Sequence, residues 1–228
     1  LTESTADLGF TLIMSSARRV AELDAWTKAG QWQASVPPSL FGSDVYGKTL
    51  GIVGMGNIGA AVARRGRLGF NMPILYSGNS RKTDLEHELG AQYRSLEQLL
   101  AEADFVCLVV PLSENTRHLI GQRELKLMKP SAILVNISRG PVVDEAALVQ
   151  ALQHGTIRGA GLDVYEKEPL SDSPLFQLKN AVTLPHIGSA THETREAMAR
   201  CAVDNLLAAL DGQRPPNLVN PSAFDQGR

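Results

Sequence analysis

The chain has 228 residues, so it contains one or two domains and is long enough to bury a core without disulfide support. Its 22 basic and 24 acidic residues give a formal net charge of −2, which argues against nucleic-acid binding. The longest apolar run, residues 105–110, is far shorter than the roughly 18 residues of a membrane span, and the polar start is not a signal peptide. The two cysteines, Cys107 and Cys201, are expected to be buried, which fits the reducing cytoplasm and no membrane contact.

The first predicted element is one long helix. Apolar residues recur at helical spacing from Leu8 to Trp26, and the pattern breaks near Gly30. A proline-containing loop follows at residues 33–47. Beyond this loop, short β-branched runs alternate with amphipathic segments, a rhythm typical of a parallel sheet flanked by helices.

The alternating segments are assigned in chain order. Strands are predicted at residues 49–53, 73–76, 105–110, 132–136, 159–164 and 182–184. Helices are predicted at residues 57–68, 95–100, 144–153 and 191–210. Ser95 and Gln98 have capping-box spacing, Asp144 is a candidate N-cap, and Gly155 would end its helix. These elements predict an α/β fold with a doubly wound parallel sheet, which binds ligands at the carboxyl ends of its strands.

A glycine pattern lies between the first predicted strand and the helix after it. Gly54, Gly56 and Gly59 form G-x-G-x-x-G, which is a weak signal alone but directly follows a strand here. This arrangement directs backbone N–H groups and the positive helix end toward a pyrophosphate. The first glycine permits the tight turn, the second lets the backbone approach the phosphates, and the third lets helix pack on strand. The pattern predicts a dinucleotide-binding site.

The end of the second predicted strand bears on the choice of cofactor. A site for NAD(H) usually has an acidic residue there, about 20 residues beyond the glycines, to bind the ribose 2′-hydroxyl. Ser77 occupies this position, and the following residues are Gly78, Asn79, Ser80, Arg81 and Lys82. Because small polar groups and two cations suit a 2′-phosphate, the sequence favours NADP(H), with NAD(H) as the alternative.

Three polar residues that follow later predicted strands suit the reduction of a keto acid. Arg139 would hold the substrate carboxylate, His186 would donate a proton to the new hydroxyl, and Glu168 would tune that donor. From spacing alone, a surface ion pair and a loop histidine remain open as alternatives. No metal site is expected, because His186 and His192 are six residues apart and no cysteine is near.

With these motifs, the sequence resembles the D-isomer-specific 2-hydroxyacid dehydrogenases. Within that family it is most similar to the glyoxylate/hydroxypyruvate reductases and the bacterial 2-ketogluconate reductases. The resemblance runs from about Thr5 to Asn220, and the matching stretches are residues 51–59, 136–144, 161–169 and 185–195. It implies a Rossmann cofactor domain and the reduction of small 2-keto acids, such as glyoxylate, hydroxypyruvate or 2-ketogluconate.

The resemblance also implies roles for individual residues. Arg139, Glu168 and His186 match the catalytic set, and Arg139, His186 and Ser189 would touch the substrate. The cofactor-binding positions would be Gly54, Gly56, Asn57, Ile58, Gly59, Ser77, Asn79, Ser80, Arg81, Pro111, Ile137, Asp163 and Gly188. Among these, Asp163 would contact the nicotinamide carboxamide, Asn57 and Ile58 the pyrophosphate, and Arg81 the 2′-phosphate.

Family members have a second, substrate-binding domain whose front part has no counterpart in this sequence. We therefore expect residues 1–190 to form the cofactor domain and residues 191–228 to return to the substrate domain, with Leu1 as a cut end. The last helix, with Leu206, Leu207 and Leu210 on its apolar side, would then be partly exposed. The family also implies a homodimer, formed through the first helix and the segment that follows it.

Two readings of function remain open beside a reductase that uses NADPH. The C-terminal binding protein corepressors resemble the same family and act as dinucleotide-sensing scaffolds. Alternatively, the chain binds its cofactor but turns over little.

Overall fold

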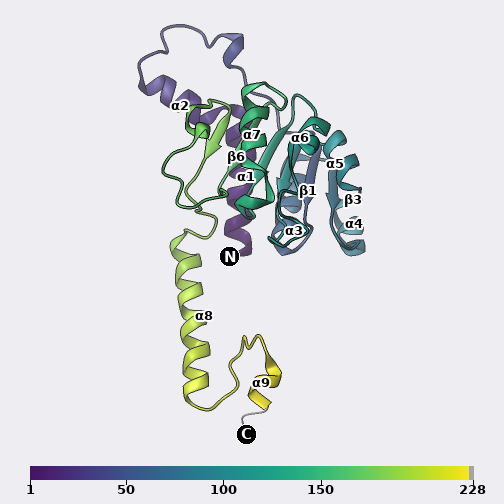
Figure 1. Ribbon diagram of the computed structural model, residues 1–228, viewed down its shortest axis with the longest axis vertical. Helices are drawn as coiled ribbons and strands as arrows, with labels where there is room; N and C mark the ends of the chain where they lie inside the picture. Colours follow the sequence, from purple (N-terminus) through teal and green to yellow (C-terminus); the bar gives the residue numbers. More distant parts are fainter. Residues whose placement is uncertain (226–228) are drawn as a thin grey trace. The chain divides into compact units, whose positions relative to one another are not determined.

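The computed structural model describes residues 1–225, and its centre is a seven-stranded parallel sheet with the order β3-β2-β1-β4-β5-β6-β7 (Figure 1). The strands are β1 (Leu50–Val53), β2 (Ile74–Ser77), β3 (Gln92–Tyr93), β4 (Phe105–Leu108), β5 (Ile133–Asn136), β6 (Gly159–Leu162) and β7 (Ala181–Thr183). Since β1 pairs with both β2 and β4, the strand order reverses beside β1. The predicted doubly wound sheet is confirmed, and β1 and β4 border the point where such sheets bind ligands.

The helices of the described residues are α1 (Thr2–Arg18), α2 (Val20–Lys28), α3 (Asn57–Arg64), α4 (Thr83–Leu89), α5 (Leu96–Glu102), α6 (Gln122–Leu127), α7 (Glu145–Gln153), α8 (His192–Leu210) and α9 (Pro221–Asp225). Of these, α1, α3 and α4 cover one face of the sheet, and α5, α6 and α7 cover the other. Shorter turns are η1 (Pro38–Leu40), the π-helical η2 (Arg65–Gly69), η3 (Gly140–Val142) and η4 (Pro174–Gln177). No helix among residues 1–225 has the length and apolar character needed to cross a membrane.

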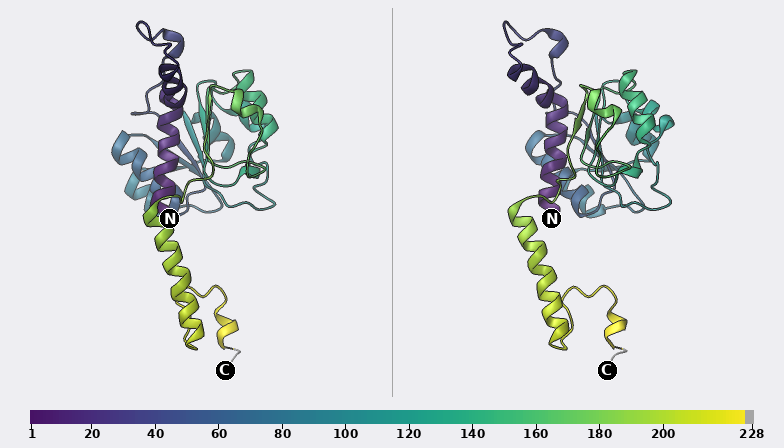
Figure 2. Two further views of the ribbon diagram at one scale, coloured as in Figure 1. Left: turned by 90° about the vertical axis from the view of Figure 1, so that its left-hand side faces the viewer. Right: turned by 60° about the vertical axis from the view of Figure 1, so that its left-hand side comes forward.

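Successive side chains of the strands point to opposite faces of the sheet and pack in two hydrophobic cores. Ile133 and Val135 of β5 lie in the core beneath α1, α3 and α4, whereas Leu134 lies in the core beneath α5, α6 and α7. Strands β1, β4, β5 and β6 are buried along their whole length, as expected for a parallel sheet covered on both faces. Figure 2 shows α1 running along its face of the sheet.

Predicted helix signals are present in the structure. Ser95 and Gln98 form a capping box, in which the Ser95 Oγ accepts from the Gln98 N–H at 3.2 Å and the Gln98 Oε1 accepts from the Ser95 N–H at 3.1 Å. Asp144 accepts a hydrogen bond from the N–H of Ala147 at 3.0 Å and so caps α7. Gly155 has a φ of +67° just after that helix, a left-handed conformation that favours glycine.

The prediction of one helix from Leu8 to Trp26 is wrong. Arg19 adopts a left-handed conformation with φ of 55° and separates α1 from α2. Its guanidinium donates to the carboxylate of Glu22 at 2.7 and 2.9 Å, which supports the break. Apolar spacing could not reveal this break, because arginine is a good helix former and the periodicity continues across it.

Two further expectations need correction. The helix predicted at residues 57–68 is α-helical only to Arg64 and continues as the π-helical turn η2. Cys107 is buried in β4, as expected, but Cys201 is exposed on α8. Periodicity misled here because most of α8 is exposed in this chain, and helical spacing does not say whether a partner surface is present.

The described residues form two compact units, one from Thr2 to Gly188 and one comprising Leu1 and the chain from Ser189 onward. In the second unit, the Thr191 hydroxyl caps α8 by accepting from the N–H of Thr194 at 3.2 Å. Leu206, Leu207 and Leu210 are exposed on this helix, in agreement with the sequence analysis. The domain boundary expected between residues 190 and 191 stays a prediction.

Candidate active site

The glycine-rich turn joins β1 to α3, and its three glycines meet different surroundings. Gly54 has a φ of +101°, and a Cβ there would lie 2.8 Å from the Val109 carbonyl oxygen. A Cβ at Gly59 would lie 2.3 Å from the Gly54 carbonyl oxygen, so only glycine lets α3 approach this closely. A Cβ at Gly56 would meet open space. The chain itself thus requires the first and third glycines, and the second leaves room for a phosphate.

A cavity of about 600 Å³ lies beside this turn. Gly56 and Asn57, at the start of α3, line it together with Arg81 and Lys82 from the loop after β2. Asn79 and Ser80 are exposed in the same loop, Ser77 is half-buried at the end of β2, and Ile58 is half-buried on α3. The fold therefore brings the glycine-rich turn to one cavity with Arg81 and Lys82, whereas Ser77, Asn79 and Ser80 do not line it.

The structure adds an acidic residue that the sequence analysis did not consider. Glu86 of α4 accepts hydrogen bonds from Nε and Nη2 of Arg81 at 3.0 and 2.7 Å. Its pKa is lowered, first by the hydrogen bond from Arg81 and then by one from Tyr76. Residues 77–82 contain no acidic residue, but Glu86 on α4 places a carboxylate beside this loop. Helix α4 itself was not predicted, so nothing pointed to Glu86.

Two further predicted cofactor residues follow β4 and β5. Pro111 is exposed, and its carbonyl oxygen accepts from the hydroxyl of Thr116 at 2.6 Å. Ile137 is buried against α1, where a Cβ on Gly9 would lie 2.7 Å from its Cδ1. Both residues therefore lie at the carboxyl edge of the sheet, near its switch point.

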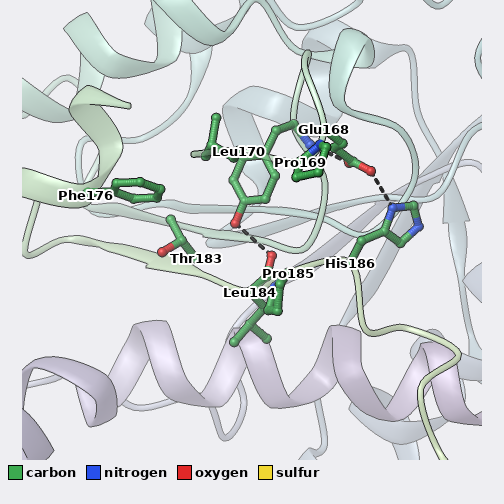
Figure 3. A pocket seen from close by; sticks show the side chains of 9 residues that line it. Glu168, Pro169, Leu170, Phe176, Thr183, Leu184, Pro185 and His186 are labelled. Atoms are coloured by element: carbon green, nitrogen blue, oxygen red, sulfur yellow. Dashed lines mark hydrogen bonds and ion pairs between the residues drawn. The ribbon is translucent and has the colours of Figure 1, made fainter. Parts of the chain in front are cut away.

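Glu168 and His186 form a hydrogen-bonded pair (Figure 3). The His186 Nδ1 lies 2.7 Å from Glu168 Oε2, and the other carboxylate oxygen accepts from the backbone N–H of Tyr165 at 2.9 Å. Because an ionised carboxylate only accepts, Nδ1 carries the proton and Nε2 is left for a ligand. An apolar cavity of about 500 Å³, lined in part by Leu170, Phe176 and Leu184, borders the pair.

Asp163 fixes the loop that carries His186. Its side chain is buried after β6 and accepts from the backbone N–H groups of Ile187 at 2.7 Å and Gly188 at 2.9 Å. Burial raises the pKa of Asp163, while these two hydrogen bonds oppose the rise. The carbonyl of Gly188 in turn accepts from the hydroxyl of Thr5 at 3.1 Å, which ties the loop to α1. His186 is held in a left-handed conformation with φ of 55° within this loop.

Arg139 projects from a turn that follows β5. The buried Asn136 builds the turn: its Oδ1 accepts from the N–H of Ser138 at 3.0 Å, and its Nδ2 donates to the Arg139 carbonyl at 3.1 Å. The Arg139 side chain is exposed and makes no ion pair within residues 1–225. Its Nη1 donates to the Ser138 carbonyl at 2.6 Å, and the other guanidinium N–H groups remain available to a ligand carboxylate.

Gly140 and Tyr165, which the sequence analysis did not single out, join the turn after β5 to the turn after β6. A Cβ on Gly140, next to Arg139, would lie only 1.7 Å from the carbonyl oxygen of Tyr165, so the turn after β5 packs directly on the turn after β6. Tyr165 also donates its hydroxyl to the Leu184 carbonyl at 2.8 Å, two residues before His186. Burial raises the pKa of Tyr165 to about 12, so the hydroxyl stays a donor. The glycine after Arg139 was the one available signal for this contact.

Two further expectations concern Ser189 and a metal site. Ser189 begins the second compact unit, and its predicted contact with substrate stays a prediction. Within the described part of the chain, no group of three or more histidine, cysteine, aspartate or glutamate side chains is arranged to hold a metal ion.

Comparisons with known proteins agree on one family. The model of the NAD-binding domain of D-isomer specific 2-hydroxyacid dehydrogenases matches residues 10–188. Glyoxylate/hydroxypyruvate reductase B from Cronobacter sakazakii is 56% identical over 98% of this chain and 69% of its own length. The corresponding protein from Escherichia fergusonii is 58% identical over 97% of this chain and 68% of its own length.

Solved structures share the fold. The TT0316 protein from Thermus thermophilus has a TM-score of 0.90 at 50% identity, over 96% of this chain and 69% of that one. An NADPH-dependent glyoxylate/hydroxypyruvate reductase from Sinorhizobium meliloti, in complex with NADP and malonate, has a TM-score of 0.83 at 37% identity, over 91% and 64% of the two chains. A D-lactate dehydrogenase with NAD+ from Lactobacillus jensenii has a TM-score of 0.86 at 28% identity, over 96% and 69%.

Proposed function

The chain belongs to the D-isomer specific 2-hydroxyacid dehydrogenase family, and from this membership we propose that it reduces small 2-keto acids to D-2-hydroxy acids with NADPH. Glyoxylate and hydroxypyruvate are the first candidate substrates, because the names of similar proteins contain them. The third candidate is 2-ketogluconate. The observation that carries the proposal is the His186–Glu168 pair. It shares the carboxyl edge of the sheet with the glycine-rich turn and with Arg139, which makes no ion pair within residues 1–225.

The residues at this edge fit a nicotinamide dinucleotide. The open space at Gly56 and the first N–H groups of α3 suit its pyrophosphate, and Arg81 and Lys82 suit a phosphate on the ribose. The bound cofactor would supply a hydride to the carbonyl carbon of the keto acid.

The protein would hold the substrate and supply the proton. Arg139 would bind the carboxylate through paired N–H groups, which also orients the adjacent carbonyl. His186 would deliver a proton from Nε2 to the carbonyl oxygen as the hydroxyl forms. Glu168 would keep the ring in place through Nδ1, and Asp163 would keep the His186 loop in place through Ile187 and Gly188. The proton and the hydride together convert the ketone to the alcohol.

The preference for NADPH over NADH is part of this proposal. It is supported by Ser77 in the place where an acid would bind a ribose 2′-hydroxyl, and by Arg81 and Lys82 beyond it. One related structure is described as NADPH-dependent and another contains NAD+, so the family uses both cofactors. We also propose a homodimer in the cytoplasm.

The test follows NADPH absorbance with glyoxylate, hydroxypyruvate and 2-ketogluconate, using this chain alone and this chain joined to the front part of a family member's substrate domain. We expect turnover with at least one substrate, and faster turnover with NADPH than with NADH at equal concentration. Dinucleotide binding without turnover of any substrate would contradict the reductase and favour the scaffold alternative.

A second histidine–glutamate pair provides a matched control for the proton donor. The His118 Nε2 lies 2.8 Å from Glu166 Oε1, and its side chain is 41% exposed, against 46% for His186. Replacing the general acid should reduce kcat by about 10²-fold or more in His186→Gln, whereas His118→Gln should keep kcat within about twofold. Equal losses in the two variants would argue against a catalytic role for His186.

A further inference from the structure

Glu86 binds one edge of the Arg81 guanidinium, the edge formed by Nε and Nη2. Nε and Nη2 donate to the two oxygens of Glu86 at 3.0 and 2.7 Å, in a paired arrangement. The Arg81 side chain is 65% exposed, whereas that of Glu86 is only 17% exposed. The carboxylate is therefore the anchored partner, and the opposite edge of the guanidinium, which contains Nη1, faces away from Glu86.

Tyr76 anchors Glu86 and the loop at once. This tyrosine is buried in β2, and its hydroxyl donates to Glu86 Oε1 at 2.6 Å. The same hydroxyl accepts from the backbone N–H of Lys82 at 2.7 Å. Its ring packs edge-on against Tyr93, with the ring centroids 5.4 Å apart. The loop between β2 and α4 is thus fixed through one buried hydroxyl.

The network has two opposing effects on a phosphate bound at Arg81. A fixed guanidinium loses less side-chain freedom when it binds, which strengthens binding. The carboxylate of Glu86 also repels a phosphate, which weakens binding. Because Arg81 is exposed, water and salt screen the repulsion, whereas the geometric restraint is not screened. We therefore expect the restraint to be the larger effect.

From this geometry we propose that Glu86 and Tyr76 are positioning residues for the 2′-phosphate of the cofactor, acting through Arg81. This inference rests on the proposed use of NADPH. Glu86 holds the Nε edge of Arg81, so the other edge is presented to the phosphate, and Tyr76 holds Glu86. Preference between the two nicotinamide cofactors then depends on α4 as well as on the loop after β2.

The test measures binding by calorimetry, with adenosine 2′,5′-bisphosphate and adenosine 5′-monophosphate as probes that differ in the 2′-phosphate. Glu86→Ala should weaken binding of the bisphosphate by about 3–10-fold, because Arg81 becomes mobile, and should change binding of the monophosphate by less than about twofold. Glu86→Gln keeps one acceptor oxygen, which Arg81 Nε and Tyr76 share, but loses the acceptor for Nη2, so it should weaken the bisphosphate less than Glu86→Ala does. Tyr76→Phe should weaken only the bisphosphate.

A double-mutant cycle separates positioning from a general structural effect. Arg81→Ala should weaken the bisphosphate by about 10-fold, and adding Glu86→Ala should change binding no further. Glu22→Ala is the matched control, because Glu22 makes the same paired contact with Arg19, at 2.7 and 2.9 Å, and neither residue lines the cavity beside the glycine-rich turn. It should leave both probes within about twofold of wild type. KM values for NADPH and NADH should follow the same pattern, with kcat unchanged.

The possible failures are distinguishable. If wild type binds the two probes equally and Arg81→Ala has no effect, the NADPH proposal and this inference are both wrong. If Arg81→Ala weakens the bisphosphate but Glu86→Ala tightens it, Glu86 is a competitor and the positioning role is overturned. Equal weakening of both probes by Glu86→Ala, or the same loss in the Arg81→Ala background, would make Glu86 merely structural.

Discussion

Asp163 holds two consecutive backbone N–H groups, and this explains how His186 keeps an unusual backbone conformation. Ile187 and Gly188 donate to separate oxygens of the Asp163 carboxylate. His186, directly before them, has a φ of 55°, which costs free energy for a residue with a side chain. The buried Asp163 side chain offsets part of that cost by accepting both N–H groups. A contact to the nicotinamide carboxamide would add to this structural role.

The raised pKa of Asp163 predicts a pH dependence of stability. Since its folded pKa lies above its unfolded value of about 3.9, protonated Asp163 contributes stability that is complete below that value and is lost as pH rises through the folded pKa. Wild type should therefore lose stability relative to Asp163→Asn as pH rises from about 4 to 7. Urea unfolding of both proteins across this range measures the difference.

The Asp172→Asn variant removes an exposed carboxylate and controls for the change in net charge. A stability difference between wild type and Asp163→Asn that stays constant with pH, or that moves in favour of wild type as pH rises, would contradict the prediction.

The two cysteines should differ sharply in reactivity. Burial raises the pKa of Cys107 to about 12, so almost no thiolate forms at pH 8, and the side chain is also inaccessible. Cys201 is exposed on α8. An Ellman titration of the native protein should detect one thiol, and Cys201→Ser should remove it. Both thiols should react in denaturant, and rapid labelling of Cys107 in the folded Cys201→Ser variant would count against this arrangement.

At the scale of elements, the packing of α3 on β1 depends on Gly59, whereas the proposed binding of the cofactor depends on Gly56. Gly59→Ala places a Cβ 2.3 Å from the Gly54 carbonyl oxygen and should lower the free energy of unfolding by about 1–3 kcal/mol. Gly56→Ala meets open space and has backbone angles that alanine adopts, so it should change stability by less than about 0.5 kcal/mol. It should nevertheless weaken dinucleotide binding, because the added methyl fills the space proposed for the pyrophosphate.

Chemical denaturation and fluorescence titration with NADPH measure these two effects separately. The prediction fails if the two variants lose stability equally, or if Gly56→Ala binds NADPH as tightly as wild type.

Elements with an apolar run or a cap signal could be predicted from this sequence, whereas short helices with neither signal could not. Buried strands such as β4 and β5 form apolar runs, and α7 has both a cap and a terminator. Helices α4 and α6 span seven and six residues, less than two full turns, so no periodicity can establish itself. The break at Arg19 depends on side-chain contacts that spacing does not encode.

The candidate site shows the same division. Arg139, Glu168 and His186 follow strands, and strand order predicts that they share one edge of the sheet. Glu86 reaches the loop after β2 only because α4 forms, and Tyr76 matters only through a hydroxyl contact with that helix. Gly140 is a signal for a close approach, but the backbone that it approaches, at Tyr165, lies in another connection, and the sequence does not say which one. Contacts between connections are the part that sequence patterns did not predict.

For the molecule as a whole, the sheet collects groups that are far apart in sequence. The glycine-rich turn follows β1, Arg81 follows β2, Arg139 follows β5 and Asp163 follows β6. Because all seven strands are parallel, their carboxyl ends lie at one edge, and every connection after a strand begins there. The first unit therefore brings together the residues proposed for the cofactor and for proton transfer.

Helix α2 offers the best test of assembly at this scale. It spans nine residues and buries none of them in the single chain, although isolated helices shorter than about 12–15 residues are marginal in water. Val20 on this helix, and Trp32 and Phe41 in the loop after it, are exposed apolar side chains. A second copy that covers this surface would supply the missing packing, so we expect a dimer at micromolar concentration in sedimentation velocity. Trp32→Asp should weaken the dimer by at least about 10-fold, since buried aromatic residues often dominate interfaces. Leu210→Asp, at another exposed apolar side chain, should leave it intact, and a monomeric wild type would contradict the proposed homodimer.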